Sequence, residues 1–429
     1  MKFHSTRQQQ LAKKLTVYHD GVGLVKEMRV IPANKEITEV EFLDISPQVD
    51  VASIWVDGLE VVEQTYQDGN IQVEQLLKKY IGEVVKIKND QTDVEIPVRL
   101  LRYLNPTIAE RLDTKEVLIN PEGHLVLPSL PEGVFIKPSL VCKIKAVEGE
   151  GQVQLSYLTD GLAWQVTYVA KMNESKLDLL AWIHLSNNTG TNFLNSHLKL
   201  VSGKVVRQHQ VPLAHSQVRF LSASEEHEPA IEEHEFADTH VYTIKQPVDI
   251  LHGQTKQLPL FQLKEIAFRK VYRVDAFSEK AKRVIEFDNT EANQLGFPLP
   301  QGQLKVYEQD QDNEVEFVGE NNIRSTTTKQ KLSIAIGEAF DITSQNWEKK
   351  RVRKDHVDYV TYAYKLENQQ SLYVRVEVHH SIFEQAWQME TSSHDYELIR
   401  SNEIVFRVHM AANKTVELEF TYKVDSGTK

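Results

Sequence analysis

The sequence of 429 residues contains one cysteine, Cys142, and this scarcity excludes several kinds of site. A single thiol forms neither an internal disulfide nor a thiolate metal cluster. Cys142 lies in the apolar stretch Pro138–Ile144, so a buried, unreactive thiol is the favoured interpretation.

Long apolar runs are also missing. No segment approaches the roughly 20 apolar residues of a membrane-spanning helix. The first residues, Met1–Lys14, are basic but have no apolar core of signal-peptide length. These features predict a cytoplasmic protein without membrane insertion.

The familiar motifs of enzymes are absent as well. The sequence has no phosphate-binding glycine loop, no nucleophile elbow and no His-Glu-x-x-His motif. The segment Gly21–Gly23 lacks the third glycine and the following helix of a dinucleotide site. The sequence therefore predicts a protein that is not an enzyme, with no catalytic, cofactor-binding or metal-binding residues.

The charge balance disfavours nucleic acid as a partner. Lys and Arg number 49 against 61 Asp and Glu, and the resulting net charge of −12 repels a phosphate backbone. The apolar share of 41% and the charged share of 26% are those of folded globular proteins. A chain of this length is expected to form two to four domains.

Apolar residues alternate with polar ones through most of the chain, as in strands with one buried face. The pattern is clearest at Val416–Val424, Ile404–Met410 and Leu372–Val378. Three such runs close together predict an antiparallel sheet. Helical spacing is best at Asn70–Ile81, with Asn70 as a cap and Gly82 as the end. A weaker helical candidate is Thr6–Lys14.

These patterns predict an all-β protein with minor α content, built as multi-domain antiparallel β-sandwiches. Residues 1–75 are expected to form an N-terminal β module. Residues 76–147 are expected to form one short helix and a small inserted β-barrel-like module. Residues 148–425 would form a C-terminal β-sandwich region, interrupted by an acidic, histidine-bearing loop at 207–240.

Two segments combine large apolar side chains with turn residues. In the first, aromatic residues flank an Asp-Gly turn: Tyr157, Asp160, Gly161, Trp164 and Tyr168. In the second, glycines and prolines bend the backbone before a strand: Gly296, Pro298, Pro300 and Gly302. Such motifs usually serve packing, so we interpret both as structural rather than chemical.

Several segments, in this order along the chain, resemble the mucoidy-inhibitor-like family, a large bacterial group: Tyr18–Glu27, Tyr157–Tyr168, Leu198–Gly203, Leu295–Tyr307 and Ile336–Asp341. The resemblance implies an all-β architecture of sandwich type. It supplies no catalytic residue that can be carried over to this sequence.

Histidines and carboxylates are concentrated between residues 207 and 252. The histidines are His209, His215, His227, His234, His240 and His252. Imidazole and carboxylate ligands suit zinc or nickel, so a metal-dependent hydrolase is an alternative hypothesis. No pair has the tight spacing of a structural metal site, and a solvated loop is the favoured interpretation.

Two other polar groups have simpler explanations. His379 and His380 are adjacent on an expected strand and would point to opposite faces. Asp310–Glu314 lacks the glycine and the final glutamate of a calcium loop, so it predicts a hairpin turn.

A basic cluster consists of Lys349, Lys350, Arg351, Arg353 and Lys354. A solvated connection is the favoured interpretation, and binding of an anion or nucleic acid is a weaker alternative. Acidic residues that could pair with the cluster, within the chain or between subunits, are Glu225, Glu226, Glu232 and Glu233.

The leading hypothesis is a non-enzymatic binding or self-assembly protein that acts as a scaffold. Its partner would be another protein or a second copy of the chain, because exposed strand edges can pair with another strand.

Overall fold

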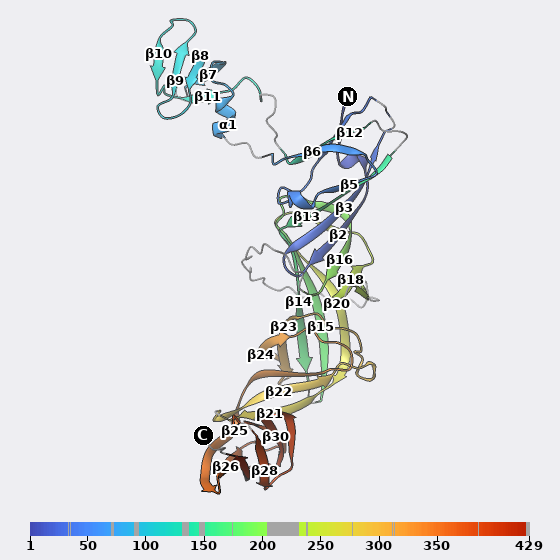
Figure 1. Ribbon diagram of the computed structural model, residues 1–429, viewed down its shortest axis with the longest axis vertical. Coiled ribbons are helices and arrows are strands. Elements are labelled where there is room, and N and C mark those ends of the chain that lie inside the picture. The colour runs from blue at the N-terminus through green and yellow to red at the C-terminus, as the bar shows by residue number, and fades with distance from the viewer. Residues whose placement is uncertain are drawn as a thin grey trace. The chain divides into compact units, whose positions relative to one another are not determined.

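The computed structural model describes residues 1–32, 34, 36–69, 73–89, 94–130, 137–145, 151–173, 175–203, 231–236, 239–276, 278–310, 312, 314–384 and 386–425. These residues are mostly strands, which confirms the all-β prediction with minor helix (Figure 1). Among them, no helix is long and apolar enough to cross a membrane. Residue contacts divide the chain into two units.

The first unit comprises Met1–Ala163, Ser186–Arg219 and Val241–Thr255. In its main sheet the neighbouring strands are β18-β16-β2-β3-β13-β5, and β19 also pairs with β16. Strands β2 and β3 are antiparallel, whereas β16 joins β2 in parallel. The bounds of these strands are β2 (Gln10–Tyr18), β3 (Val22–Ile31), β5 (Trp55–Asp57), β13 (Gly151–Asp160), β16 (Phe193–Val201), β18 (Thr239–Ile244) and β19 (Val248–Ile250).

Two smaller sheets complete this unit. One has the order β1-β4-β12-β6 and contains Cys142, which is fully buried as expected. Burial raises the pKa of the Cys142 thiol to about 12, so it stays protonated and unreactive. The strands are β1 (Lys2–Ser5), β4 (Glu39–Leu43), β6 (Val61–Gln67) and β12 (Ser139–Ile144).

The other small sheet corresponds to the expected barrel-like module, but it is open. Its order is β10-β9-β8-β7-β11, with β10 and β11 at the two edges. Helix α1 (Val73–Lys78) precedes it, and Leu76 and Tyr80 pack against its core. The helix is shorter than the predicted Asn70–Ile81, and the proposed cap Asn70 lies outside the described residues. The strands are β7 (Val84–Lys88), β8 (Glu95–Arg102), β9 (Ile108–Arg111), β10 (Val117–Ile119) and β11 (His124–Val126).

The weaker helical candidate Thr6–Lys14 was wrong. Thr6 and Gln9 do form a capping box, but the helix that they start is a single 3-10 turn, Arg7–Gln9. Strand β2 follows immediately. In it Lys13, Leu15 and Val17 are buried, and the residues between them are more exposed, which is the alternation of a strand.

The core of the first unit contains a buried ion cluster. Glu27 lies between Lys13 and Arg29, with oxygen to nitrogen distances of 3.0 Å to Lys13 Nζ and 2.5 Å to Arg29 Nη2. All three residues are at most 3% exposed. Arg29 also donates to the carbonyls of Ser5 (2.7 Å) and Leu43 (2.9 Å). Burial raises the pKa of Glu27, but the charges of Arg29 and Lys13 outweigh that effect and lower it.

The second unit comprises Trp164–Leu185, Phe220–His240 and Lys256–Lys429. One of its sheets has the order β20-β15-β14-β23-β24. The expected parts 1–75 and 76–147 therefore lie in the first unit, and the expected part 148–425 is shared by both units. The strands are β14 (Leu162–Met172), β15 (Lys176–Asn187), β20 (Gln254–Ala267), β23 (Gly302–Gln309) and β24 (Val315–Ile323). The remaining short elements of the described residues are the 3-10 turns Val51–Ser53 and Glu291–Asn293, and strand β17 (Ile231–Phe236).

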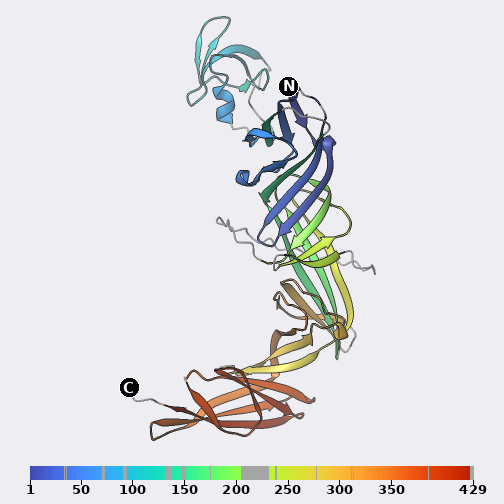
Figure 2. The same ribbon diagram turned by 45° about the vertical axis from the view of Figure 1, so that its right-hand side comes forward.

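The other sheet of the second unit has the order β28-β31-β26-β25-β22-β21-β27-β30-β29. It folds over to form two facing layers, drawn in yellow to red (Figure 2). Phe406 of β30 and Phe420 of β31 meet between the layers, with ring centroids 4.9 Å apart. The strands are β21 (Arg269–Asp275), β22 (Lys280–Asp288), β25 (Lys331–Lys354), β26 (Val357–Asn368), β27 (Val374–Ser381), β28 (Trp387–Ser392), β29 (Tyr396–Arg400), β30 (Glu403–Met410) and β31 (Lys414–Asp425).

The first packing motif lies where expected. Tyr157, Trp164 and Tyr168 are at most 3% exposed. Asp160 ends β13, Gly161 makes the turn with φ of +90°, and β14 begins at Leu162. The two strands belong to different sheets, so this turn transfers the chain from one sheet to another rather than closing a hairpin.

The residues of the second packing motif lead into β23, which begins at Gly302. Gly296 has φ of +98°. A Cβ at Gly302 would lie 2.3 Å from the carbonyl oxygen of Val166 on the neighbouring strand β14. Glycine at position 302 therefore permits the close parallel approach of β23 to β14.

Candidate interaction surface

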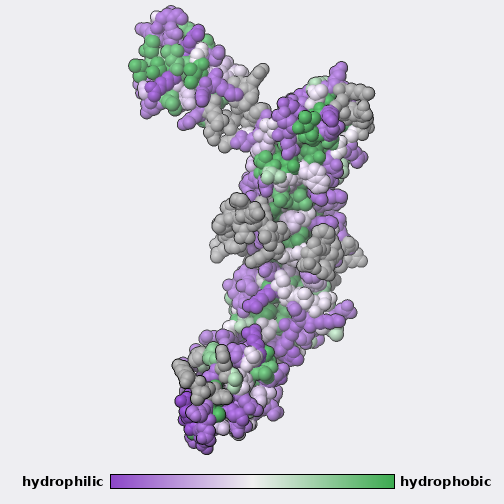
Figure 3. Space-filling model, viewed as in Figure 1, coloured by the Kyte–Doolittle hydropathy of each residue, from purple (hydrophilic) through white to green (hydrophobic). Residues whose placement is uncertain are grey.

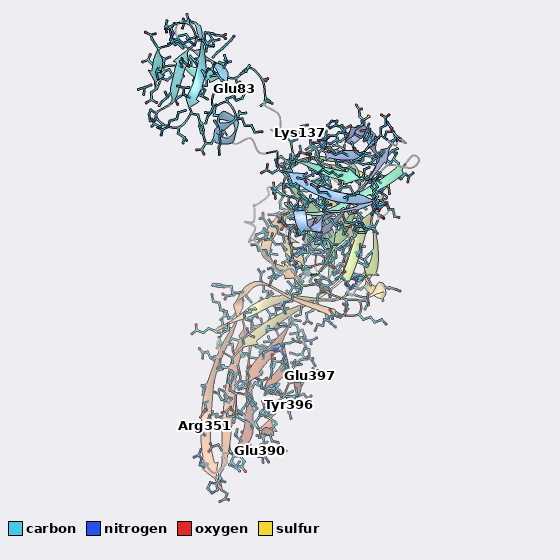
Figure 4. All side chains as sticks on the ribbon, turned by 45° about the horizontal axis from the view of Figure 1, so that its top comes forward. Glu83, Lys137, Arg351, Glu390, Tyr396 and Glu397 are labelled. Atoms are coloured by element: carbon cyan, nitrogen blue, oxygen red, sulfur yellow. The ribbon has the colours of Figure 1, made fainter. Side chains whose placement is uncertain are left out.

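The two ends of the nine-stranded sheet, β28 and β29, come together along one side of the folded sheet. The indole Nε1 of Trp387 in β28 donates a 2.9 Å hydrogen bond to the carbonyl of Ser401, directly after β29. Glu390 of β28 and Tyr396 and Glu397 of β29 are labelled on these two strands in Figure 4. Two edge strands therefore border the same part of the surface.

Strand β29 continues the apolar inner face beyond the region that the other layer covers. It pairs with β30 alone among the described strands, with Tyr396 opposite Phe406 and Leu398 opposite Ile404. Phe406 and Ile404 are fully buried, but Tyr396 is 44% exposed and Leu398 is 55% exposed. The strand thus offers apolar side chains together with backbone groups on its outer edge.

A bulge interrupts β29 near its end. The register with β30 shifts between Leu398 and Arg400, so Ile399 is the extra residue and is exposed. Short length and a bulge are features that limit how far an edge strand can pair with another chain.

A second exposed aromatic residue, Phe383, lies between two residues whose positions are fixed by contacts, Ile382 and Glu384. The amide of Ile382 donates to the carbonyl of Asn402 (2.8 Å), and Glu384 lies 3.7 Å from Arg351 and 3.4 Å from the phenol of Tyr422. Burial raises the pKa of Tyr422 far above its ordinary value, and the charge of Glu384 adds to this rise. Phe383 itself is 75% exposed.

We call these side chains the edge face: Phe383, Trp387, Tyr396, Leu398 and Ile399. Aromatic and aliphatic anchors of this kind are typical of the centres of protein interfaces. On the face of this part of the chain that Figure 3 shows, hydrophilic side chains predominate. Sequence reasoning did not single out the edge face, because Tyr396–Arg400 looks like any short strand until its pairing is known.

The basic cluster was expected to lie in a solvated connection. The structure instead places it at the end of strand β25. The residues Asp355 and His356 form the tight turn to β26, with φ of +47° and +65°. Two consecutive left-handed residues are the geometry of a two-residue hairpin. Strand residues that face solvent are as polar as loop residues, which explains the error.

Neighbouring carboxylates neutralise much of the cluster. Lys349 pairs with Glu419 of β31, a contact that raises the pKa of Lys349. Arg351 pairs with Glu348 at 2.8 Å and Arg353 with Asp358 at 2.6 Å. Lys350 and Lys354 are exposed on the same strand.

The acidic partners proposed for the cluster are only partly described. Glu225 and Glu226 lie outside the described residues, as does the side chain of Glu232. Glu233 interacts with His240 at 2.8 Å. The proposed pairing of the two charged groups therefore stays a prediction.

The histidines of the alternative metal-site hypothesis are placed only in part. His209, His215 and His227 and the side chain of His234 lie outside the described residues. Within the described part of the chain, no group of three or more potential ligands is gathered. His252 is described and accepts a hydrogen bond from the amide of Gly190 (3.1 Å).

His379 and His380 do face opposite sides of β27, as predicted. His379 interacts with Glu403 at 2.9 Å. His380 is buried against Phe420 and Tyr362, and its Nδ1 lies 2.8 Å from the phenol of Tyr364. Likewise, Asp310 begins the turn between β23 and β24, where its carboxylate accepts from the amides of Asp312 and Glu314.

Comparison with protein-family models and with curated proteins found no match. The likeness to the mucoidy-inhibitor-like family therefore stays a resemblance based on the segments named above.

Proposed function

We propose that the protein is a non-enzymatic, cytoplasmic assembly protein that associates with a second copy of itself through the edge face. The observation that carries the proposal is the exposure of Tyr396 and Leu398 on an edge strand. Burying them against another chain removes apolar surface from water, and the outer backbone groups of β29 gain hydrogen-bond partners.

The charges of β29 favour an identical strand as the occupant. Glu397 and Arg400 flank the apolar centre of the strand and carry opposite charges. Two copies that run antiparallel place Glu397 of each near Arg400 of the other, whereas parallel copies place like charges together. Within one chain, Glu397 pairs with Arg407 and Arg400 pairs with Glu403. Both are surface ion pairs, so exchanging them for pairs between copies costs little free energy.

The expected association is weak and depends on concentration. A five-residue strand with a bulge supplies few intermolecular hydrogen bonds. A small contact of this kind belongs to the class of transient interfaces, which bury less than about 1,200 Å². Further edges could extend such pairs into larger scaffolds.

Light scattering on size-separated, untagged protein over a wide concentration range tests the proposal. The mass of the wild-type protein is expected to rise with concentration, and Leu398→Lys should keep it monomeric because it buries a charge in the contact. Val117→Lys is the matched control, since Val117 is 58% exposed on the edge strand β10 of another sheet.

A wild-type protein that stays monomeric at every concentration would overturn the proposal and direct attention to a different protein as the partner. Association that survives Leu398→Lys but fails in Val117→Lys would move the interface to the small sheet. Melting curves of both variants show whether the fold is retained.

A further inference from the structure

A polar hollow of about 410 Å³ lies in the first unit, apart from the edge face. Its charged and donor side chains are Arg7, Asp44, Lys137 and His252, and the loop residues 190–192 form one wall. The volume is within the range of small-molecule sites, roughly 300–1,000 Å³. No step of the proposed self-association uses this hollow.

Arg7 is positioned by local structure on both sides. It begins the 3-10 turn that the capping box of Thr6 and Gln9 fixes, directly before β2. Its Nη2 donates to Thr191 Oγ1 (3.2 Å) and to the carbonyl of Asn192 (3.4 Å). Both bonds use Nη2, and among the described residues Nε and Nη1 have no acceptor, so either can donate to a ligand.

The loop between β15 and β16 is fixed by a buried polar network. Asn187 and Thr189 are fully buried. The side-chain Nδ2 of Asn187 donates to the carbonyls of Thr191 (2.9 Å) and Ile250 (3.0 Å). Its side-chain Oδ1 accepts from the backbone N–H of Thr189 (3.1 Å). Such complete satisfaction of buried polar groups rigidifies a segment. The loop is therefore organised before any ligand binds.

Close packing reinforces this loop at Gly190. Gly190 has φ of +86°, and a Cβ there would lie 2.4 Å from Pro47 Cγ. The backbone thus rests directly on Pro47, and its amide is directed at Nδ1 of His252. Because Nδ1 accepts that bond, the proton of the neutral ring is on Nε2, which makes Nε2 a donor.

Positive charge exceeds negative charge in the lining. Arg7 and Lys137 contribute two positive charges and Asp44 one negative charge, so the lining carries a formal charge of +1. The whole chain carries −12. Lys137 lies 3.5 Å from Asp44 and is well exposed, so its ammonium can also reach a ligand.

Apolar residues complete the lining. Ile45, Pro47 and Pro138 border the hollow beside the charged groups. A bare inorganic ion would leave this apolar surface uncovered, whereas a carbon skeleton would cover it.

We propose that this hollow binds a small organic molecule through an oxyanion group, either a carboxylate or a phosphate. The guanidinium of Arg7 would donate a charge-assisted hydrogen bond to the oxyanion, and Lys137 would add a point charge. His252 Nε2 would donate the third contact. The carbon skeleton would lie on Ile45 and the two prolines.

Calorimetric titration of the full chain with citrate and, separately, with glycerol phosphate tests this inference at constant ionic strength. Binding of one molecule per chain is expected for at least one of the two, and the pair distinguishes a carboxylate from a phosphate ligand. Arg7→Ala should weaken binding by at least about tenfold, since charge-assisted hydrogen bonds are lost. Lys137→Ala should weaken it to a smaller extent.

Lys14→Ala is the matched control. It removes the same charge from an exposed position in the same unit, where Lys14 lies opposite Lys26 of β3. Unchanged binding in this variant is expected. The inference is overturned if neither compound binds the wild-type protein, or if Lys14→Ala weakens binding as much as Lys137→Ala. Among the described residues, Lys137 contacts a charged partner only at Asp44, 3.5 Å away on the surface, so its variant keeps the test decisive if Arg7→Ala fails to fold.

Discussion

The phenol of Tyr168 donates a 2.6 Å hydrogen bond to the carbonyl oxygen of Pro300, a residue 132 positions away in the sequence. Both groups are buried. The bond joins the two packing motifs, because Tyr168 belongs to β14 and Pro300 comes just before β23. Two segments that the sequence marks separately are thus parts of one junction.

Tyr168→Phe should lower the free energy of unfolding by about 1–3 kcal/mol, because it removes the donor from a buried carbonyl while keeping the ring. Denaturant unfolding measures the change. Tyr307→Phe is the control, since the phenol of Tyr307 has no hydrogen-bond partner among the described residues and should change stability little. Equal effects of the two substitutions would contradict the role of the bond.

Gly302→Ala should destabilise the same junction by about 1–3 kcal/mol, because the added methyl meets the Val166 carbonyl. Gly151→Ala is the matched control, as its nearest contact would be 4.0 Å away. Thermal melting of both variants checks this prediction. A stable Gly302→Ala variant would show that β23 can move away from β14 without cost.

Glu27→Gln should cost about 3–5 kcal/mol, because it leaves the buried cations Lys13 and Arg29 without their counter-charge. Glu95→Gln removes a carboxylate from the exposed pair with Lys86 and should cost less than about 1 kcal/mol. Urea unfolding compares the two. Similar small losses would mean that water reaches the cluster.

The buried His380 should make stability fall in mild acid. Burial lowers its pKa from the ordinary 6.5 to about 4, so the unfolded chain takes up a proton between these values and the folded chain does not. At about 1.4 kcal/mol per pH unit, the stability lost as the pH falls from 6.5 to 4 is about 3 kcal/mol.

His380→Gln should flatten that part of the pH dependence, whatever it does to stability at neutral pH. Urea unfolding at about pH 7 and about pH 4.5 measures the slope. His409→Gln changes an exposed histidine and should leave the slope intact. An unchanged slope in His380→Gln would assign the acid sensitivity to other groups.

The edge face and the polar hollow could not be predicted from the sequence, for different reasons. Leu398 alternates like a buried strand residue, and only its place at the end of the sheet exposes it. Arg7 and His252 are 245 positions apart in the sequence and meet through the loop after β15. The turn-forming residues Asn187–Asn192 were a usable signal, but they do not reveal which side chains surround them.

The sequence by itself determined the strands, since alternation at Ile404–Met410 and Val416–Val424 places one apolar face in a core whatever the pairing. It also determined the turns at Gly161 and Asp310. Tertiary structure alone decided which strands pair, as for β14 with β23. It also decided that Glu27 and Arg29 are buried and Leu398 is exposed, because pairing and burial depend on contacts between distant segments, whereas alternation is a local property.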